Sequence, residues 1–368
     1  MKKIKRLSVI GLRGIPNVMG GVETHCANLY SEIIKCSNDY EINVIGRDRY
    51  IIDSTYLGIK VKALPSIYTS SLETLFHTFI SIFYAKFYLK SNIVHLHAVG
   101  SGLFMPMVRL LGMKGILTVH GADYKRSKWG RVAKFLLKSG ERLGITFSNQ
   151  TIVVGKQLSE ELKSEYGKAN NKITYIPNGI DINVDYDSEF AERDFFDSME
   201  VEPKSYILYV GRLDPAKGIE DLIKAYKKSG TKLKLLIVGG SEHKGDFYHH
   251  ITSYADKNII FSGVLSGDRL MAAYKNTALY VLPSYHEGHP ISVLEAINFN
   301  APIIVSDIIP NLSLNLPSES YYKLADIDDL AFKLTEGKFN TVDRNQYIEL
   351  YNWQTIAKET LIVYSKTS

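Results

Sequence analysis

The chain of 368 residues has little cysteine and no long uninterrupted apolar run. Its only two cysteines, Cys26 and Cys36, are too few for a disulfide framework and match no metal-ligand spacing. The longest apolar stretch, residues 72–89, contains charged side chains, which argues against a membrane-spanning helix. The basic N-terminus lacks an apolar segment long enough for a signal peptide. We therefore expect a cytoplasmic protein in a reducing compartment.

A dinucleotide-binding fingerprint is also absent. The segment Gly11-Leu12-Arg13-Gly14 follows the first predicted strand but does not meet the three-glycine spacing, which disfavours a nicotinamide oxidoreductase. No recognised nucleic-acid-binding module accompanies the basic residues, so nucleic acid is not an expected partner.

Acidic residues are scarce in the first half of the chain. Residues 1–185 hold 25 Lys and Arg against 14 Asp and Glu, a net charge of +11, whereas the remainder carries −6. This asymmetry predicts that the first half faces an anionic partner, either a membrane surface or a phosphorylated acceptor; a drift of charge without function is the alternative. The basic, partly amphipathic stretch 129–142 is the candidate for a peripheral contact with the inner face of the cytoplasmic membrane, and a solvated helix face is its alternative.

Short apolar runs alternate with helix-compatible stretches twice along the chain, which is typical of an α/β protein with doubly wound parallel sheets. The predicted strands are residues 4–12, 41–45, 93–96, 116–119 and 150–154, then 206–210, 233–238, 259–262, 279–283 and 302–306. The predicted helices are residues 22–35, 72–89, 102–111, 129–143 and 156–165, then 218–228, 245–255, 267–275 and 291–299.

The acidic, aperiodic stretch 181–204 is predicted to be a linker, so we expect one domain over residues 1–183 and a second over 184–351. Both are expected to be Rossmann-like. Ligands of such folds bind at the carboxyl ends of the strands, and we therefore expect the two domains to face a central cleft.

Two segments of the second half carry side chains suited to a phosphorylated, hydroxyl-rich ligand. Arg212 and Lys217 follow a clear strand, where a guanidinium and an ammonium can converge on a diphosphate. Glu287 follows another strand, and Glu295 lies in the helix after it, where a carboxylate can accept hydrogen bonds from ribose hydroxyls. The turn between these glutamates offers backbone N–H groups from three residues: Gly288, His289 and Ile291. Solvated charges are the alternative for each segment.

The first half offers a glycine pair and several histidines. Gly20 and Gly21 open a helix, where N–H groups can meet a phosphate or a sugar hydroxyl. His120 ends a strand and is predicted to donate a hydrogen bond to a hydroxyl-rich ligand such as a sugar, whereas satisfaction by the backbone is its alternative. For His95 and His97, which end the strand before it, the structural explanation is favoured.

These features together resemble a known family. The resemblance rests on Gly20-Gly21-Val22-Glu23, on Arg212 with Lys217, and on Glu287 with Glu295. They are similar to the pattern of family 4 retaining glycosyltransferases of the GT-B fold, over nearly the whole chain. The segment Gly11-Leu12-Arg13-Gly14-Ile15-Pro16 also resembles a bacterial subgroup that includes rhamnosyltransferases of capsule and O-antigen assembly.

The resemblance implies a role for each site residue. Arg212 and Lys217 would hold the diphosphate of a nucleotide-sugar donor, Glu295 its ribose and Glu287 its sugar. His120 would lie near the reaction centre, and Gly20 and Gly21 would face donor phosphate and acceptor. The implied residues on the acceptor side are Arg13, Glu23 and His97. Residues 352–368 would form a helix that packs back on the first domain.

The resulting hypothesis is transfer of a sugar, with retention, to a glycan or a polyprenyl-diphosphate-linked saccharide. No metal and no cofactor are expected, and Asp185-Tyr186-Asp187 is taken as a chance match to a metal-binding Asp-x-Asp because it lies in the predicted linker. Two alternatives stay open. An NDP-sugar 2-epimerase would use the same phosphate site without an acceptor, and a non-catalytic protein would only bind the nucleotide sugar.

Overall fold

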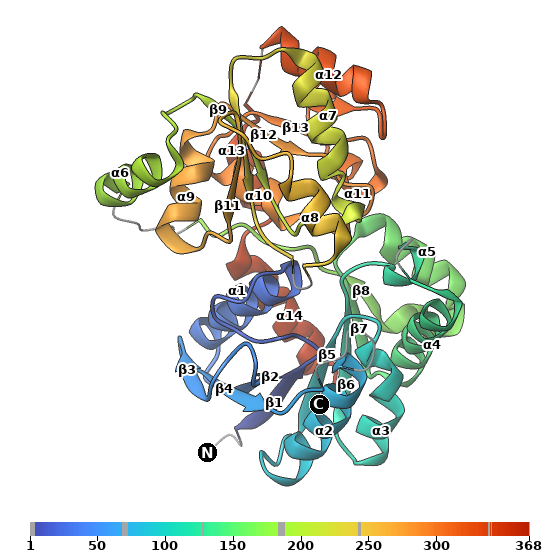
Figure 1. The fold of residues 1–368 in the computed structure, drawn as a ribbon. Helices are drawn as coiled ribbons and strands as arrows, with labels where there is room; N and C mark the ends of the chain where they lie inside the picture. Colours follow the sequence, from blue (N-terminus) through green and yellow to red (C-terminus); the bar gives the residue numbers. More distant parts are fainter. Residues whose placement is uncertain are drawn as a thin grey trace. The chain divides into compact units, whose positions relative to one another are not determined.

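The computed structural model describes residues 4–67, 73–126, 129–182, 188–241, 244–337, 339 and 341–367. It divides into two compact α/β units (Figure 1). Unit 1 comprises Met1–Gly179 together with Trp353–Ser368, and unit 2 comprises Ile180–Asn352. The division thus follows Gly179, whereas the boundary predicted between residues 183 and 184 lies outside the described residues.

Unit 1 is built on an eight-stranded sheet with the order β3-β4-β2-β1-β5-β6-β7-β8. All neighbouring strands are parallel except β3 and β4, which pair antiparallel at one edge. The strands are β1 Lys5–Ile10, β2 Tyr40–Arg47, β3 Ser54–Tyr56, β4 Ile59–Leu64, β5 Ile93–His97, β6 Lys114–Val119, β7 Gln150–Val153 and β8 Ile173–Tyr175.

Helices cover both faces of this sheet. One face packs against α1 (Gly21–Cys36) and α14 (Trp353–Ser365), which lie side by side (Figure 1). The helices on the other face are α2 Glu73–Phe87, α3 Met105–Leu110, α4 Arg131–Phe147 and α5 Lys156–Glu165. Successive strand residues alternate between the two apolar clusters, as Val9 and Ile10 do, because side chains along a strand point to opposite faces. The last helix of the chain therefore completes unit 1.

Unit 2 has a six-stranded parallel sheet with the order β11-β10-β9-β12-β13-β14. Its strands are β9 Tyr206–Val210, β10 Lys234–Val238, β11 Ile259–Gly263, β12 Leu279–Leu282, β13 Ile303–Ser306 and β14 Tyr321–Tyr322. Its helices are α6 Ser188–Met199, α7 Ile219–Ser229, α8 Asp246–Thr252, α9 Gly267–Asn276, α10 Ile291–Asn298, α11 Ile309–Leu312, α12 Ile327–Glu336 and α13 Arg344–Leu350. Two α/β halves with parallel sheets confirm the predicted fold class.

The prediction of a linker without regular structure over residues 181–204 is wrong. Residues Ser188–Met199 form α6, and Phe195 of this helix is fully buried in the apolar core of unit 2. The helix packs against α9. Most of its residues are charged or polar, so the few apolar positions that anchor it leave only a weak helical period in the sequence.

Candidate active site

Two loops of unit 2 meet because the strands that precede them are neighbours. Strands β9 and β12 pair in parallel, so the segment after Val210 and the segment after Leu282 leave the same edge of the sheet. Gly218 ends the first loop with φ +65°, and a Cβ atom there would clash with the carbonyl oxygen of Pro283. Glycine at this position therefore permits the close approach of the two loops.

Lys217 and Glu287 form an ion pair across these two loops. The Lys217 Nζ atom lies 2.5 Å from Glu287 Oε1, and both side chains are largely buried. The Ser284 hydroxyl donates to the same carboxylate oxygen over 2.7 Å. One contact to Glu287 leaves an ammonium group with two further protons to donate. The structure thus brings together two residues that the sequence singled out separately, and holds them at the carboxyl ends of two strands.

Arg212 follows β9 in the same loop as Lys217. The Tyr209 hydroxyl donates to the Arg212 carbonyl oxygen over 3.0 Å and holds the loop backbone. Within the part of the chain that the structure describes, the Arg212 guanidinium makes no hydrogen bond or ion pair, and its side chain is half-buried. A fixed backbone with an uncommitted guanidinium suits the binding of a phosphate group.

Glu295 lies in α10, behind the segment that carries Glu287. Its Oε2 atom accepts a hydrogen bond of 2.8 Å from the Tyr274 hydroxyl. Burial raises the pKa of Glu295 to about 7, against the opposing effect of that hydrogen bond. This carboxyl group therefore titrates near neutrality, and hydroxyl groups of a ligand would stabilise its charged form.

The turn between the two glutamates is tightly packed. The helix α10 begins at Ile291, after Pro290. The His289 ring is buried, lies 5.2 Å from the Tyr351 ring, and burial lowers its pKa to about 3. A neutral imidazole contributes no charge to this turn, so any attraction of the turn for an anion arises from its backbone N–H groups and the helix N-terminus.

In unit 1, Arg13 and Glu23 are committed to each other. The Arg13 guanidinium donates to both oxygens of Glu23 over 2.9 Å each, and the Arg13 backbone N–H donates over 3.0 Å. Burial alone would raise the pKa of Glu23, but the charge and hydrogen bonds of Arg13 outweigh it and lower that pKa. The pair sits beneath Gly20, which precedes α1 with φ +147°, whereas Gly21 is open to its surroundings. The ion pair between Arg13 and Glu23 therefore stabilises the loop before α1.

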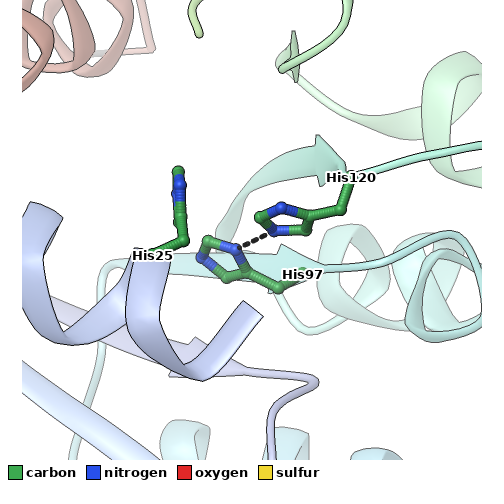
Figure 2. Close-up of side chains that lie close together, drawn as sticks. All are labelled: His25, His97 and His120. Atoms are coloured by element: carbon green, nitrogen blue, oxygen red, sulfur yellow. Dashed lines mark hydrogen bonds between the residues drawn. The ribbon is translucent and has the colours of Figure 1, made fainter. Parts of the chain in front are cut away.

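Four histidines gather on the face of the unit 1 sheet that α1 and α14 cover. His95 and His97 lie on β5, His120 follows β6, and His25 lies on α1. His97 Nδ1 lies 2.9 Å from His120 Nε2, and the His25 ring meets the His120 ring edge-on at 4.8 Å (Figure 2). His25 Nδ1 is held by the Asn178 amide oxygen at 2.8 Å.

These histidines are neutral imidazoles at ordinary pH. Burial lowers the pKa of His25 to about 4 and that of His95 to about 3. Burial, and after it the neighbouring histidines, hold the pKa values of His97 and His120 well below their usual range. Because His120 is only half-buried, it is the member of the group that a ligand can reach.

The nitrogens of His25, His97 and His120 lie within 4.8 Å of one another, the one grouping of this kind among the described residues. Three imidazoles can hold a transition metal. However, both nitrogens of His97 are already engaged, one by Tyr30 and one by His120. A bound cation would have to replace the bond between His97 and His120, so the geometry favours a hydrogen-bonded cluster. Asp185-Tyr186-Asp187 lies outside the described residues.

The structure therefore separates the sequence-predicted residues into two groups. Lys217 and Glu287 pair in unit 2, and Arg212 lies in the same loop as Lys217. In unit 1, His97 is fully buried behind His120 and contacts a ligand only through it. The sequence did not indicate His25 and Tyr30, although the spacing of His95 and His97 on one strand face was a signal that polar partners must cover them.

Both units have the Rossmann-like form of the GT-B fold. The Anabaena protein Alr3699/HepE in complex with UDP and glucose has a TM-score of 0.74 to this chain, with 13% identity over 98% of this chain and 99% of that one. Two family models match the sequence. "Glycosyltransferase Family 4" matches residues 19–184, and "Glycosyl transferases group 1" matches residues 190–331. Together the two models match most of the chain, which is therefore similar in sequence to glycosyltransferases.

Two curated relatives differ in how much of the chain they match. An uncharacterized glycosyltransferase of Methanocaldococcus jannaschii is 26% identical over 95% of each chain. The N,N'-diacetylbacillosaminyl-diphospho-undecaprenol alpha-1,3-N-acetylgalactosaminyltransferase of Campylobacter jejuni is 28% identical over 48% of this chain and 47% of its own. Among the described residues, no helix is both long enough and apolar enough to cross a membrane.

Proposed function

We propose that this protein transfers a sugar from a nucleotide-sugar donor to a hydroxyl group of a glycan or of a polyprenyl-diphosphate-linked saccharide. The observation that carries the proposal is the Lys217–Glu287 pair at the ends of β9 and β12, with Arg212 in the same loop as Lys217. Two cations and a helix N-terminus suit a diphosphate, and the two carboxylates suit hydroxyl groups. A family relative that acts on a diphospho-undecaprenol substrate supports the class of acceptor.

In the proposed reaction, the acceptor oxygen attacks the anomeric carbon on the face that the diphosphate leaves. The bond to the diphosphate oxygen breaks, the bond to the acceptor oxygen forms, and the acceptor's proton passes to the departing diphosphate. Arg212 and Lys217 stabilise the charge that develops on that diphosphate. Glu287 orients the sugar, Glu295 accepts from the ribose, and His120 donates to the sugar. Same-face attack retains the anomeric configuration.

No step of this scheme needs a metal ion. Activity should survive treatment with EDTA. Loss of activity that manganese restores would contradict this part of the proposal. The cluster of His25, His97 and His120 would then be the candidate metal site.

The donor can be identified by thermal shift with UDP-, GDP- and dTDP-sugars. A ligand at about 100-fold its dissociation constant adds about 2.7 kcal/mol of stability. The donor that stabilises the protein is then incubated with and without acceptor, and the products are separated. A glycoside formed only with acceptor supports the proposal. A 2-epimer formed from the donor alone would identify an epimerase, and unchanged donor under all conditions would leave only binding.

We further propose that unit 1 contacts an anionic membrane where it meets a lipid-linked acceptor of capsule or O-antigen synthesis. Exposed apolar side chains support this surface. Val132 and Phe135 on α4 are 75% and 71% exposed beside Arg131 and Lys134. The helix α2 also carries an exposed stripe of four phenylalanines at helical spacing: Phe76, Phe79, Phe83 and Phe87. Both helices pack against the short 3-10 helix Ser101–Phe104.

Sedimentation with vesicles containing anionic lipid tests this contact. Binding should be strong at low salt and should weaken as salt rises, because exposed charges are screened. Replacing Val132 and Phe135 by Ser should reduce binding, whereas the same change at Phe190, an exposed residue of α6 in unit 2, serves as the control. Absence of binding at low salt would sink this part of the proposal.

A further inference from the structure

A continuous run of polar side chains in unit 1 ends at His120. The hydroxyls of Tyr364 and Tyr30 each lie 2.8 Å from His95 Nδ1. The Tyr30 hydroxyl also lies 2.7 Å from His97 Nε2, and His97 Nδ1 lies 2.9 Å from His120 Nε2. We call this run the buried relay. Its residues come from α14, α1, β5 and the end of β6, and all except His120 are fully buried.

The outer end of the relay is the nitrogen of His120 that faces away from His97. No hydrogen bond to His120 Nδ1 exists among the residues that the structure describes. This nitrogen therefore remains for a ligand. Its chemistry depends on its proton, because an Nδ1–H group donates a hydrogen bond and a bare Nδ1 accepts one.

The proton on His120 is linked to the other members because their imidazoles are neutral. Burial lowers the pKa of His95 to about 3 and holds those of His97 and His120 well below the usual range. A neutral imidazole has one N–H and one bare nitrogen, so a ring that accepts at one nitrogen must donate at the other. The direction of the first hydrogen bond thus sets the direction of every later one.

The relay can run in two directions, because the single proton of the Tyr30 hydroxyl can point toward His97 or toward the side where His95 and Tyr364 lie. If Tyr30 donates to His97 Nε2, then His97 donates from Nδ1 to His120 Nε2, and His120 carries its own proton on Nδ1. If Tyr30 donates to His95 instead, every bond reverses, and His120 Nδ1 is bare.

Tyr364 selects the first direction. His95 Nε2 lies 2.7 Å from the Thr118 hydroxyl. When His95 carries its proton on Nε2 and donates it to that hydroxyl, its Nδ1 keeps one lone pair. The Tyr364 hydroxyl occupies that lone pair at 2.8 Å. The proton of Tyr30 is then directed to His97 Nε2.

We propose that Tyr364, acting through the buried relay, fixes His120 in the tautomer that carries its proton on Nδ1. Tyr364 is a positioning residue, since it acts on a ligand only through His120. The use of that N–H rests on the proposed function: it donates to an oxygen of the transferred sugar. The tautomer itself rests on the geometry of unit 1 alone.

Long-range proton–nitrogen NMR on protein labelled with 15N-histidine tests the proposal, because it distinguishes the two tautomers directly. The His120 signals are assigned by their loss in the His120→Gln variant. In the unaltered protein, His120 should carry its proton on Nδ1. In Tyr364→Phe, which keeps the ring and removes the hydroxyl, a second set of His120 signals with the proton on Nε2 should appear.

Tyr40→Phe is the matched control, because the Tyr40 ring packs 5.6 Å from the Tyr364 ring but lies outside the relay. It should leave the His120 signals unchanged. Tyr30→Phe breaks the relay at its bridge and should alter the tautomer even if Tyr364→Phe fails to fold. A His120 proton on Nε2 in the unaltered protein, or an unchanged tautomer in both folded relay variants, would overturn the proposal.

Activity gives a second, separable readout. Tyr364→Phe should lower kcat by about tenfold with little change in the KM for the donor, since a hydrogen bond to the sugar is weakened in the transition state. If no donor supports sugar transfer while the tautomer changes as expected, the proposed function fails and the relay stands. If sugar transfer proceeds while the His120 tautomer is the same in the unaltered protein, Tyr364→Phe and Tyr30→Phe, the relay fails and the proposed function stands.

Discussion

Lys217 and Glu287 lie 70 positions apart in the sequence, and their side chains meet at 2.5 Å because β9 and β12 are neighbours in the sheet of unit 2. Each residue thus holds the other at the strand ends. An ammonium with protons left to donate and a carboxylate beside it form a polar site that neither residue makes alone.

Removing either member of this pair should abolish most of the turnover. Lys217→Ala leaves Glu287 largely buried without its cation and removes a donor to the diphosphate, so kcat/KM should fall by at least about 100-fold. Glu287→Gln keeps the shape of the side chain but removes its charge, and kcat/KM of this variant should also fall by at least about tenfold. Steady-state kinetics with the identified donor measures both. Lys224→Ala is the control, because Lys224 forms an exposed pair with Glu220 on α7 and should leave kinetics unchanged.

Nucleotide affinity should depend on pH through Glu295. Burial raises the pKa of this carboxyl group to about 7, so lowering the pH through neutrality protonates it and removes acceptors for ribose hydroxyls. Titration calorimetry should therefore show weaker nucleotide binding at pH 6 than at pH 8. The Glu295→Gln variant should bind weakly at both pH values. An equal dependence on pH in that variant would assign the effect to another group.

Unit 1 should lose stability in mild acid. Burial lowers the pKa of His25 to about 4, His77 to about 4 and His95 to about 3, whereas unfolded histidines titrate near 6.5. Below pH 6.5 these histidines bind protons in the unfolded chain but stay neutral in the folded chain. The free energy of unfolding therefore falls as the pH drops from about 6.5 to about 4. Each histidine can contribute up to about 1.4 kcal/mol per pH unit in that window.

Urea denaturation followed by tryptophan fluorescence measures this loss in unit 1, since both tryptophans, Trp129 and Trp353, belong to it. The variant His77→Gln should reduce the slope of stability against pH. His249→Gln, an exposed position in unit 2, should not. Constant stability of unit 1 between pH 6.5 and 4.5 would contradict the buried, neutral state of these histidines.

Gly218 should tolerate no side chain, for a reason that a matched glycine can isolate. Gly218 and Gly230 flank α7 with φ +65° and +63°, so Ala at either position incurs about 1 kcal/mol of backbone strain. Only at Gly218 would the new Cβ also clash with the Pro283 carbonyl, whereas Gly230 faces open space. Gly218→Ala should therefore lower both the melting temperature and kcat/KM, and Gly230→Ala only the former. Equal kinetics in the two variants would refute the role given to the loop contact.

The sequence was sufficient for features that depend on local pattern. Alternating apolar runs predicted the strands β9 and β12, and the glycine and proline around them predicted the turns that carry Lys217 and Glu287. The contact between those two side chains was not predictable, because it depends on the order of strands in the sheet. Edge strands such as β3 and β14 were missed because they are short and only partly buried.

The histidine cluster of unit 1 also depends on contacts between distant parts of the sequence, which local patterns do not predict. His95 and His97 were recognisable as strand-end residues, but their partners Tyr30 and Tyr364 lie on two helices from opposite ends of the chain. No local spacing links them. Likewise, the resemblance implied acceptor-side roles for Arg13 and Glu23, and no pattern in the sequence indicated that the two side chains pair with each other.

The path of the chain has a consequence for synthesis. Because α14 packs on α1 only after unit 2 has been traversed, a growing chain carries an unfinished unit 1 until residue 353 and those beyond it leave the ribosome. Until then, the apolar face that receives Ile356 and Val363 lacks its cover, and His95 lacks the hydroxyl of Tyr364. A segment translated after unit 2 therefore closes a unit whose strands are made before unit 2, so translation arrested before α14 exposes an incomplete unit 1 to chaperones and proteases.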